Sequence, residues 1–347
     1  MTLALLLVGY GNVAKRFVTL LDESSAALAA LDIQPVIVGV MTRRHGRVFD
    51  GAGLDASSIA QRLTAGGGQE DPATVPAALE WCARLSSQRA EARVLVETTT
   101  LDVRSGEPAI SHVRAAFGTG THVVTANKGP VAFAWRPLAD EAAAAGVSFF
   151  FEGAVMDGVP IFNLVRETMP AVEIRGFRGV VNSTTNYLLT AMERGQPFER
   201  ALLEMQAAGV AEADPSLDVD GWDATAKAAA MANVWLDART TPTAVPREGI
   251  GPETASRAVA ALASGRRLKL VASGSGRGPD AAVRVRLEEL DATDPLAIAA
   301  GQANALELDT WPLGRLVITQ RGGGLEKTAY ALLTDLVAVA KRGTLGT

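Results

Sequence analysis

Carboxylates and a lysine are concentrated between residues 209 and 230. The first half of this stretch is a loop, GVAEADPSLDVDG, in which Pro215 and Gly221 disfavour regular structure. Its acids are Glu212, Asp214, Asp218 and Asp220. A helix is predicted to follow, and Asp223 and Lys227 stand four residues apart on it, so they share one face. This cluster would suit a small zwitterionic substrate, because the acids would hold an amino group and the lysine would move a proton.

The Asp223–Lys227 pair also has a simpler interpretation. An acid followed by a lysine at this spacing is common on exposed helices, where the ion pair contributes about 0.3–0.5 kcal/mol. The spacing alone therefore does not separate a catalytic pair from a surface pair.

The composition excludes several classes of function. The chain has 347 residues, 48% of them hydrophobic, which is enough for two domains with sizeable cores. A net charge of −5 argues against a nucleic-acid partner. Cys82 is the only cysteine and the three histidines are scattered, so no disulfide or thiolate metal cluster is expected. No apolar run reaches membrane-spanning length, and we expect a cytoplasmic protein.

The N-terminal residues match a dinucleotide-binding pattern. An apolar strand predicted over residues 3–8 leads into GYGNVA and then into a helix, and this context makes the pattern credible. Gly9 would permit the tight turn, and Gly11 would let the backbone approach a pyrophosphate. Asn12 and Val13 would contribute N–H groups at the helix N-terminus, where an anion is favoured.

The end of the second predicted strand, residues 36–41, bears on the choice of cofactor. An acid there would bind the adenosine ribose of NAD, but the sequence continues MTRRH without an acid. Arg43 and Arg44 would pair with the 2′-phosphate of NADP, because a guanidinium fork matches that group. We therefore predict NADP in preference to NAD, although both arginines could instead be solvated loop residues.

Polar residues at the ends of two further strands would face the same crevice. One strand ends in ETTT, which places Thr98 and Thr99 where a ribose or a carboxamide would bind, although threonines are also ordinary turn residues. The strand that begins at His122 leads to Lys128, which would face the crevice unless it is a plain surface lysine.

The order of elements predicts an α/β protein of two domains. Residues 1–150 are predicted to form a Rossmann-type doubly wound parallel sheet, with residues 46–75 as a surface excursion that holds at most a short helix. Residues 151–321 are predicted to form an α+β domain with a mixed or antiparallel sheet. Within this domain, the segment from the end of the Lys227 helix to about residue 266 is predicted to be loosely structured. The helix in residues 322–347 is expected to pack back on the first domain.

The segment NSTTNY follows the first predicted strand of the second domain. Ser183 and Thr184 stand at a predicted helix start, where hydroxyl groups cap free N–H groups. The same N–H groups would be able to hold a substrate carboxylate, so the motif allows either role.

In combination, these motifs resemble the homoserine dehydrogenase family over nearly the whole chain. The matching segments are GYGNVA, VVTANKGP, EGAVMDGVPI, NSTTNY, AEADPSLDVDGWDATAK and TAYALLTDL, in the family's order. The resemblance implies interconversion of L-homoserine and L-aspartate 4-semialdehyde with a nicotinamide cofactor, on the route to threonine, methionine and isoleucine. It also implies a homodimer joined through the second, catalytic domain, and a short form without the C-terminal regulatory domain of many bacterial members.

The resemblance also implies roles for individual residues. Lys227 would match the family's acid/base lysine, and Lys128 and Asp223 would be the other catalytic residues. The substrate would contact Glu212, Asp218, Asp223 and Thr184. Gly322, in the glycine-rich turn before the last helix, is a further predicted cofactor contact.

A monovalent cation such as Na⁺ is also implied by the resemblance, in the loop after the predicted crossover strand. Its ligands would be Glu152 and the backbone carbonyls of Val155, Asp157 and Val159.

The chain departs from the family pattern at several positions. Met156, Asp157 and Ser183 stand where the family usually has glycines, Val210 where many members have tyrosine, and Leu325 where glycine is common. The added side chains constrain backbone that glycine leaves free and would narrow a pocket. Two alternatives therefore stay open: a related dehydrogenase for another short amino-acid semialdehyde, and a nucleotide-binding homologue without catalysis.

Overall fold

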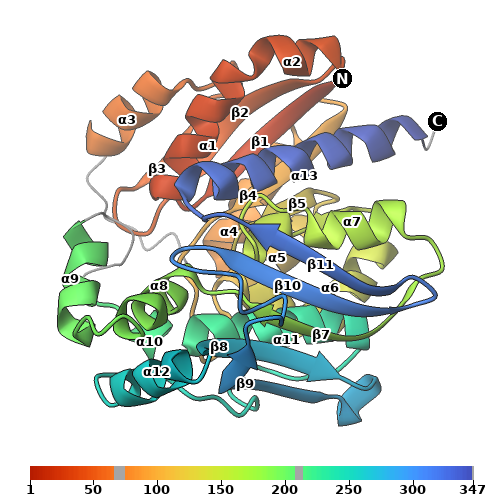
Figure 1. The fold of residues 1–347 in the computed structure, drawn as a ribbon. Coiled ribbons are helices and arrows are strands. Elements are labelled where there is room, and N and C mark those ends of the chain that lie inside the picture. Colours follow the sequence, from red (N-terminus) through yellow and green to blue (C-terminus); the bar gives the residue numbers. More distant parts are fainter. Residues whose placement is uncertain (66–74, 208–213, 346–347) are drawn as a thin grey trace. The chain divides into compact units, whose positions relative to one another are not determined.

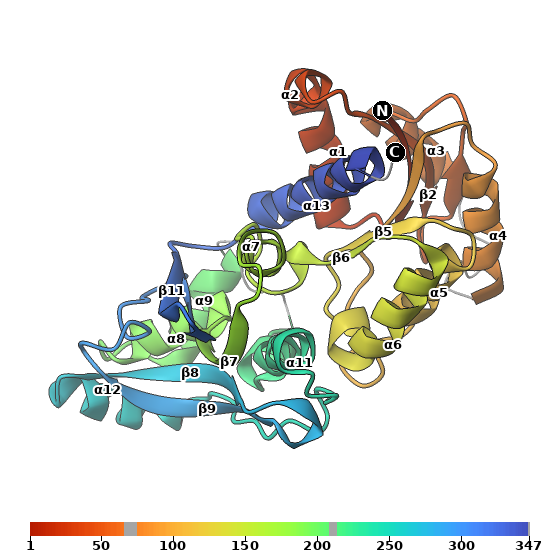
Figure 2. The ribbon, with the colours of Figure 1, turned by 90° about the vertical axis from the view of Figure 1, so that its right-hand side faces the viewer.

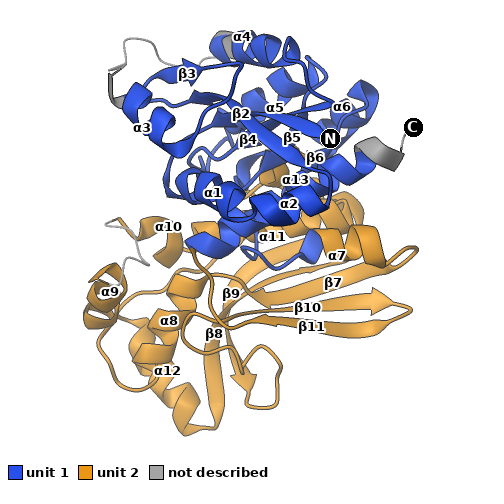
Figure 3. Ribbon diagram, turned by 90° about the horizontal axis from the view of Figure 1, so that it is seen from above, with its two compact units in different colours: residues 1–130, 136–162, 325–347 blue, residues 131–135, 163–324 orange. Residues whose placement is uncertain are grey.

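The computed structural model describes residues 1–65, 75–207 and 214–345, which form two compact units (Figure 3). Unit 1 contains residues 1–130, 136–162 and 325–347, and unit 2 contains residues 131–135 and 163–324. The main passage into unit 2 follows Phe162, later than the crossover predicted at Phe151. None of the described helices is long and apolar enough to cross a membrane.

Unit 1 is built on a six-stranded sheet with the order β3-β2-β1-β4-β5-β6 (Figure 1). Its strands are β1 (Thr2–Val8), β2 (Gln34–Met41), β3 (Arg47–Phe49), β4 (Ala92–Glu97), β5 (His122–Thr125) and β6 (Phe149–Phe150). Only the β2–β3 pair is antiparallel among these pairs. The residues of β1 from Leu3 to Val8 are all buried, as expected for a central parallel strand. The predicted doubly wound sheet is confirmed.

The helices of unit 1 surround this sheet. They are α1 (Asn12–Glu23), α2 (Ser25–Ala30), α3 (Ala56–Ala65), α4 (Val75–Ser86), α5 (Ala109–Phe117), α6 (Gly129–Ala145), η1 (Glu152–Ala154) and α13 (Leu325–Leu345), while α7 (Ile161–Thr168) carries the chain into unit 2. Helix α13 lies beside α1 (Figures 1 and 2). Leu332 and Leu336 of α13 belong to the same buried cluster as Phe17 and Leu21 of α1.

Unit 2 contains a five-stranded sheet with the order β11-β10-β7-β8-β9. Its strands are β7 (Glu173–Val180), β8 (Arg266–Ser275), β9 (Ala282–Asp291), β10 (Asn304–Trp311) and β11 (Gly314–Gln320). Its helices are α8 (Ser183–Met192), α9 (Phe198–Ala207), α10 (Ser216–Val219), α11 (Trp222–Leu236) and α12 (Thr254–Ala263), with a short η2 (Gly278–Asp280). Helices α8, α11 and α12 pack against β8, so the sheet supports the helix that carries Lys227.

Three details differ from the sequence-based expectations. The sheet of unit 2 is antiparallel in all its strand pairs, so the mixed alternative is wrong. The excursion after residue 46 contains strand β3 as well as α3; β3 was missed because a three-residue strand shows no period. The region before residue 266 contains α12, which follows the Pro- and Gly-rich residues 242–252 that suggested irregular structure.

Candidate functional site

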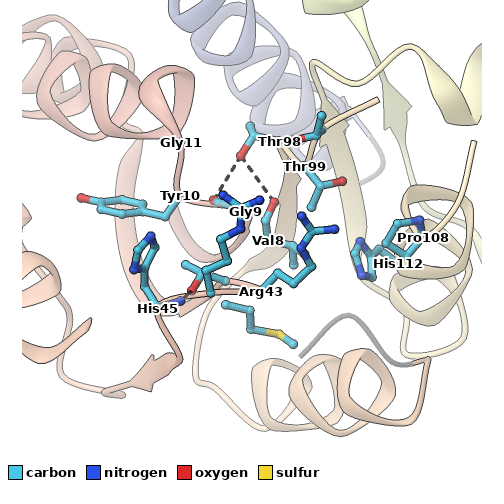
Figure 4. Close-up of a pocket in the computed structure, with 14 residues that line it drawn as sticks. Val8, Gly9, Tyr10, Gly11, Arg43, His45, Thr98, Thr99, Pro108 and His112 are labelled. Atoms are coloured by element: carbon cyan, nitrogen blue, oxygen red, sulfur yellow. Dashed lines mark hydrogen bonds between the residues drawn. The ribbon is translucent and has the colours of Figure 1, made fainter. Parts of the chain in front are cut away.

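Unit 1 has a cavity of about 300 Å³ at the carboxyl ends of β1, β2 and β4 (Figure 4). The strand order reverses at this point, with β2 on one side of β1 and β4 on the other, which is where doubly wound sheets bind nucleotides. The lining residues are Val8, Gly9, Tyr10, Gly11, Met41, Thr42, Arg43, Arg44, His45, Thr98, Thr99, Thr100, Pro108 and His112.

The glycine turn is tightly packed at Gly9 and open at Gly11. Gly9 has a φ of +94°, and a Cβ there would lie 2.7 Å from the Thr98 carbonyl oxygen, so only glycine fits. At Gly11, by contrast, a Cβ would meet nothing within 4 Å. Gly11 is the N-cap of α1 and provides no side-chain cap, so the first N–H groups of that helix, from Asn12 and Val13 onward, remain able to bind an anion. These features fit a dinucleotide cofactor.

Two arginines lie at the opposite rim of the cavity, after the end of β2. Arg43 and Arg44 are both exposed, and within the described part of the chain their side chains make no hydrogen bond or ion pair. Arg43 extends into the cavity from this end of the sheet (Figure 4). Their guanidinium groups are therefore able to bind a phosphate without first breaking an internal contact.

The hydroxyl groups of the predicted threonines already have protein partners. Thr98 donates to the carbonyl oxygen of Gly9 at 3.1 Å, and Thr99 donates to the carboxylate of Glu97. Both residues line the cavity, and their role toward a cofactor stays a prediction. The predicted cofactor contacts of Lys128 and Gly322 also stay predictions, since neither residue lines this cavity. Lys128 is half-buried at the N-cap of α6. Gly322 belongs to unit 2 and lies in the turn that follows β11 and precedes α13.

Unit 2 brings Lys227 and Asp223 together near the start of α11. The Lys227 Nζ lies 2.9 Å from Asp223 Oδ2 and donates to the carbonyl oxygen of Val181 at 2.6 Å. The two side chains are only 12% and 16% exposed. This shielding does not fit the alternative of a solvated surface pair, which would gain little from the contact.

Asn182, which sequence reasoning overlooked, organises the acids around this pair. Its Nδ2 donates to Asp218 Oδ1 at 2.7 Å and to Asp223 Oδ2 at 2.9 Å, and its Oδ1 accepts the N–H of Thr185 at 2.8 Å. Asn182 is therefore the N-cap of α8, and the prediction that Ser183 and Thr184 supply the cap is wrong. The signal was available, because asparagine before a helix start is a preferred N-cap.

The cluster holds more negative than positive charge. Burial raises the pKa of Asp218, and the nearby Asp223 carboxylate raises it further, whereas hydrogen bonds from Asn182 and Thr184 and the charge of Lys227 oppose the shift. An additional ammonium group would favour the charged form of Asp218. Glu212 and Val210 lie outside the described residues.

The loop predicted to bind a cation holds its acids in protein contacts. Glu152 is 1% exposed, its Oε1 accepts the N–H of Phe162 at 2.9 Å, and its own N–H donates to Asp335 at 2.8 Å. Asp157 has a φ of +48° and accepts a hydrogen bond from Thr328 at 3.0 Å. The backbone carbonyls of Val155 and Val159 are the other predicted ligands. That of Val159 accepts the N–H of Ile161 at 2.8 Å. Among the described residues no group of three or more His, Cys, Asp or Glu could hold a metal ion.

The protein has two features: a cavity at the switch point of the sheet that fits a dinucleotide, and a shielded lysine among carboxylates. Together they are typical of nicotinamide-dependent oxidoreductases. The family model for homoserine dehydrogenase matches residues 160–337. The chain belongs to the homoserine dehydrogenase family, and so to the oxidoreductases that act on a CH–OH group.

Relatives along the whole chain agree with this assignment. An NAD(+)-dependent homoserine dehydrogenase of Pseudomonas canavaninivorans is 35% identical, over 98% of this chain and 97% of its own. The crystal structure of the Thermoplasma acidophilum homoserine dehydrogenase superposes with a TM-score of 0.79 at 25% identity, covering 98% of this chain and 100% of that one. A hyperthermophilic archaeal homoserine dehydrogenase in complex with NADPH has a TM-score of 0.77 at 25% identity, with 99% and 98% covered.

We predict that Asn182→Asp lowers kcat/KM for L-homoserine at least about 30-fold. The substitution retains an oxygen that caps α8 but places a third carboxylate against Asp218 and Asp223, which costs about 2 kcal/mol or more through lost donors and repulsion. Steady-state kinetics measures the effect. Asn233→Asp on α11 is the control, because it also removes buried amide donors in unit 2 without adding charge to this cluster. Equal losses in both variants would contradict the prediction.

Proposed function

We propose that this protein reduces L-aspartate 4-semialdehyde to L-homoserine and runs the reverse reaction, with NADP preferred. The observation that carries the proposal is the position of Lys227, whose Nζ is held by Asp223 and the Val181 carbonyl inside a group of carboxylates. The nicotinamide cofactor, when bound, supplies or accepts the hydride.

Lys227 acts as the acid of the reduction. A lysine is normally protonated near neutral pH, so its ammonium is able to donate a proton to the aldehyde oxygen as that oxygen gains negative charge. Asp223 stabilises the ammonium at 2.9 Å, and the Val181 carbonyl at 2.6 Å fixes its direction. In the oxidation, the neutral amine accepts the hydroxyl proton. We place Lys128 near the reacting oxygen, as the family resemblance implies.

The carboxylates recognise the amino end of the substrate. Asp218 and Asp223 share hydrogen bonds from Asn182, and Lys227 pairs with Asp223, so two carboxylates stand against one ammonium in this cluster and would attract a substrate ammonium. Thr184, which is 5% exposed and hydrogen-bonded to Asp218, would contact the substrate. Glu212 would complete the set.

The preference for NADP rests on the end of β2. Arg43 and Arg44 line the cavity there, and no acid is present to bind the ribose hydroxyls. The relatives include an NAD(+)-dependent enzyme and one in complex with NADPH, so the family allows either cofactor. Gly9, Gly11, Thr98, Thr99 and Gly322 would complete cofactor binding.

Three further features are part of the proposal, and the family resemblance implies the first two, a cation and a dimer. A monovalent cation such as Na⁺ would bind Glu152 with the carbonyls of Val155, Asp157 and Val159. The enzyme would be a homodimer joined through unit 2. It would act in the cytoplasm.

The proposed reaction predicts a strong preference for a substrate that carries an α-amino group. With NADPH, we expect L-aspartate 4-semialdehyde to exceed succinate semialdehyde, which lacks the amino group, by at least about 100-fold in kcat/KM, since losing the contact between the substrate ammonium and the carboxylates would cost about 3 kcal/mol. The measurement is the loss of NADPH absorbance. Similar rates with both aldehydes, or activity with a different amino-acid semialdehyde only, would contradict the proposal.

The cofactor preference predicts an unequal effect of Arg43→Ala. We expect the KM for NADPH to rise about tenfold, or about 1.4 kcal/mol, because a charge-assisted contact to the 2′-phosphate is lost, while the KM for NADH changes less than twofold. Arg136→Ala, at an exposed arginine of α6 paired with Asp140, serves as the control. An equal change for NADPH and NADH would refute the role of Arg43.

A further inference from the structure

A buried carboxylate lies directly behind the wall of the cofactor cavity, and the reaction proposed above does not use it. Glu97 is the last residue of β4 and is 0% exposed. Burial of a carboxylate is costly, and even a well-paired buried charge is a weak source of stability. Its retention at the ligand-binding end of the sheet therefore calls for a role other than stability.

The hydrogen bonds of Glu97 join the ends of two neighbouring strands. Its Oε1 accepts the backbone N–H of Thr99 at 3.0 Å and also the Thr99 hydroxyl. Its Oε2 accepts the hydroxyl of Thr125, the last residue of β5, at 3.0 Å. The nearby His112 lies with its Nδ1 3.7 Å from Oε1, which is too long for a hydrogen bond. Among the described residues, the three groups that donate hydrogen bonds to the carboxylate are neutral, and His112 would add a positive charge within ion-pair distance only when protonated.

Asn127 extends this network to the start of α6. Its backbone N–H donates to Thr125 Oγ1 at 2.9 Å, and its Nδ2 donates to Thr99 Oγ1 at 3.3 Å and to the Thr99 carbonyl at 3.1 Å. Its Oδ1 accepts the N–H of Gly129 at 2.8 Å. Lys128 stands between Asn127 and Gly129, so both its neighbours are fixed by the same side chain.

The directions of these bonds show why an acceptor is needed at position 97. The hydroxyls of Thr99 and Thr125 each receive an N–H from Asn127, so each has its own proton left to donate. Glu97 Oε1 accepts from Thr99, and the Thr125 hydroxyl lies 3.0 Å from Oε2 and 3.1 Å from the backbone carbonyl oxygen of Glu97. A carboxylate accepts at both positions, so it orients the Thr99 hydroxyl and supports that of Thr125.

We propose that Glu97 is a positioning residue for the cofactor half of the site. Through Thr99 it sets the cavity wall, and through Thr125 and Asn127 it sets the backbone that carries Lys128. It does not touch the reacting atoms. The part of this inference that concerns turnover rests on the proposed function, whereas the part that concerns cofactor binding does not.

Glu97→Ala tests the inference by removing both side-chain acceptors, while the backbone carbonyl of residue 97 stays as an acceptor for Thr125. We expect the Kd for NADPH, measured without substrate by calorimetry, to rise at least tenfold, and kcat at saturating substrates to fall at least tenfold. The KM for L-homoserine should stay within twofold, because the contacts of the Asp223–Lys227 cluster described above are made within unit 2. A Kd for NADPH within twofold of the wild-type value would overturn the proposal.

Glu97→Gln provides the conservative rescue. The amide oxygen of the glutamine would still accept the hydrogen bonds from Thr99, and its amide nitrogen would donate to the Thr125 hydroxyl. The proton of that hydroxyl would then be accepted by the backbone carbonyl of residue 97, which lies 3.1 Å away in the wild type. We expect a Kd for NADPH within threefold of wild type. A Kd as high as that of the alanine variant would overturn the hydrogen-bonding account. If the wild type binds NADPH but does not reduce the semialdehyde, the proposed function fails and these comparisons of Kd still stand.

Thr125→Val keeps the test decisive even if Glu97→Ala does not fold. It removes one hydroxyl from the network at nearly constant volume, and we expect the Kd for NADPH to rise threefold or more. Thr121→Val is the matched control, because Thr121 is equally buried and its hydroxyl contacts that of Thr119, 3.1 Å away and outside the network. Equal values of Kd for the two threonine variants would contradict the role assigned to Thr125 and Glu97.

Discussion

The substrate half of the site depends on a single carboxamide, that of Asn182. Two carboxylates that face each other repel, and burial makes the repulsion worse. Asn182 donates one N–H to Asp218 and the other to Asp223, and its oxygen accepts a backbone N–H at the start of α8. A carboxamide provides two donors and an acceptor without a charge, so it neutralises neither acid. Asn182 therefore supplies hydrogen bonds to both acids, and Lys227 supplies the positive charge beside Asp223.

The cofactor half uses the opposite arrangement. At the end of β4, an acceptor-only side chain, Glu97, receives the protons of two hydroxyls, whereas at the end of β7 a donor amide serves two acids. Glu97 is the last residue of β4 and Asn182 follows β7, each at the point where the chain turns toward a helix or loop. In each case the groups that we propose to contact ligands are Lys227, Asp218 or Thr99, while a neighbour fixes their geometry. This separation lets a site be rigid without using its reactive groups as structural supports.

Short-range patterns predicted much of this structure. The apolar run of β1 and the glycines at 9 and 11 identified the nucleotide-binding sheet, and the four-residue spacing of Asp223 and Lys227 placed them on one face of α11. The positioning residues were not found, because their partners are distant in the sequence: Asn182 and Asp223 are 41 residues apart, and Glu97 and Thr125 are 28 apart. Hydrophobic periodicity predicts local backbone structure. Contacts between residues far apart in the sequence form only when the fold brings their strands and helices together.

The central claim, that Lys227 donates the proton, is tested most directly by single-turnover reduction of L-aspartate 4-semialdehyde in Lys227→Met and Lys227→Arg. Methionine keeps the apolar stem without the ammonium, and arginine keeps a positive charge beside Asp223. We expect the methionine variant to bind NADPH within about twofold of wild type but to oxidise it about 10²–10⁴-fold more slowly, because it lacks a general acid. Arginine should rescue folding but little of the rate, because it remains protonated. Oxidation by the methionine variant within tenfold of the wild-type rate would contradict the account.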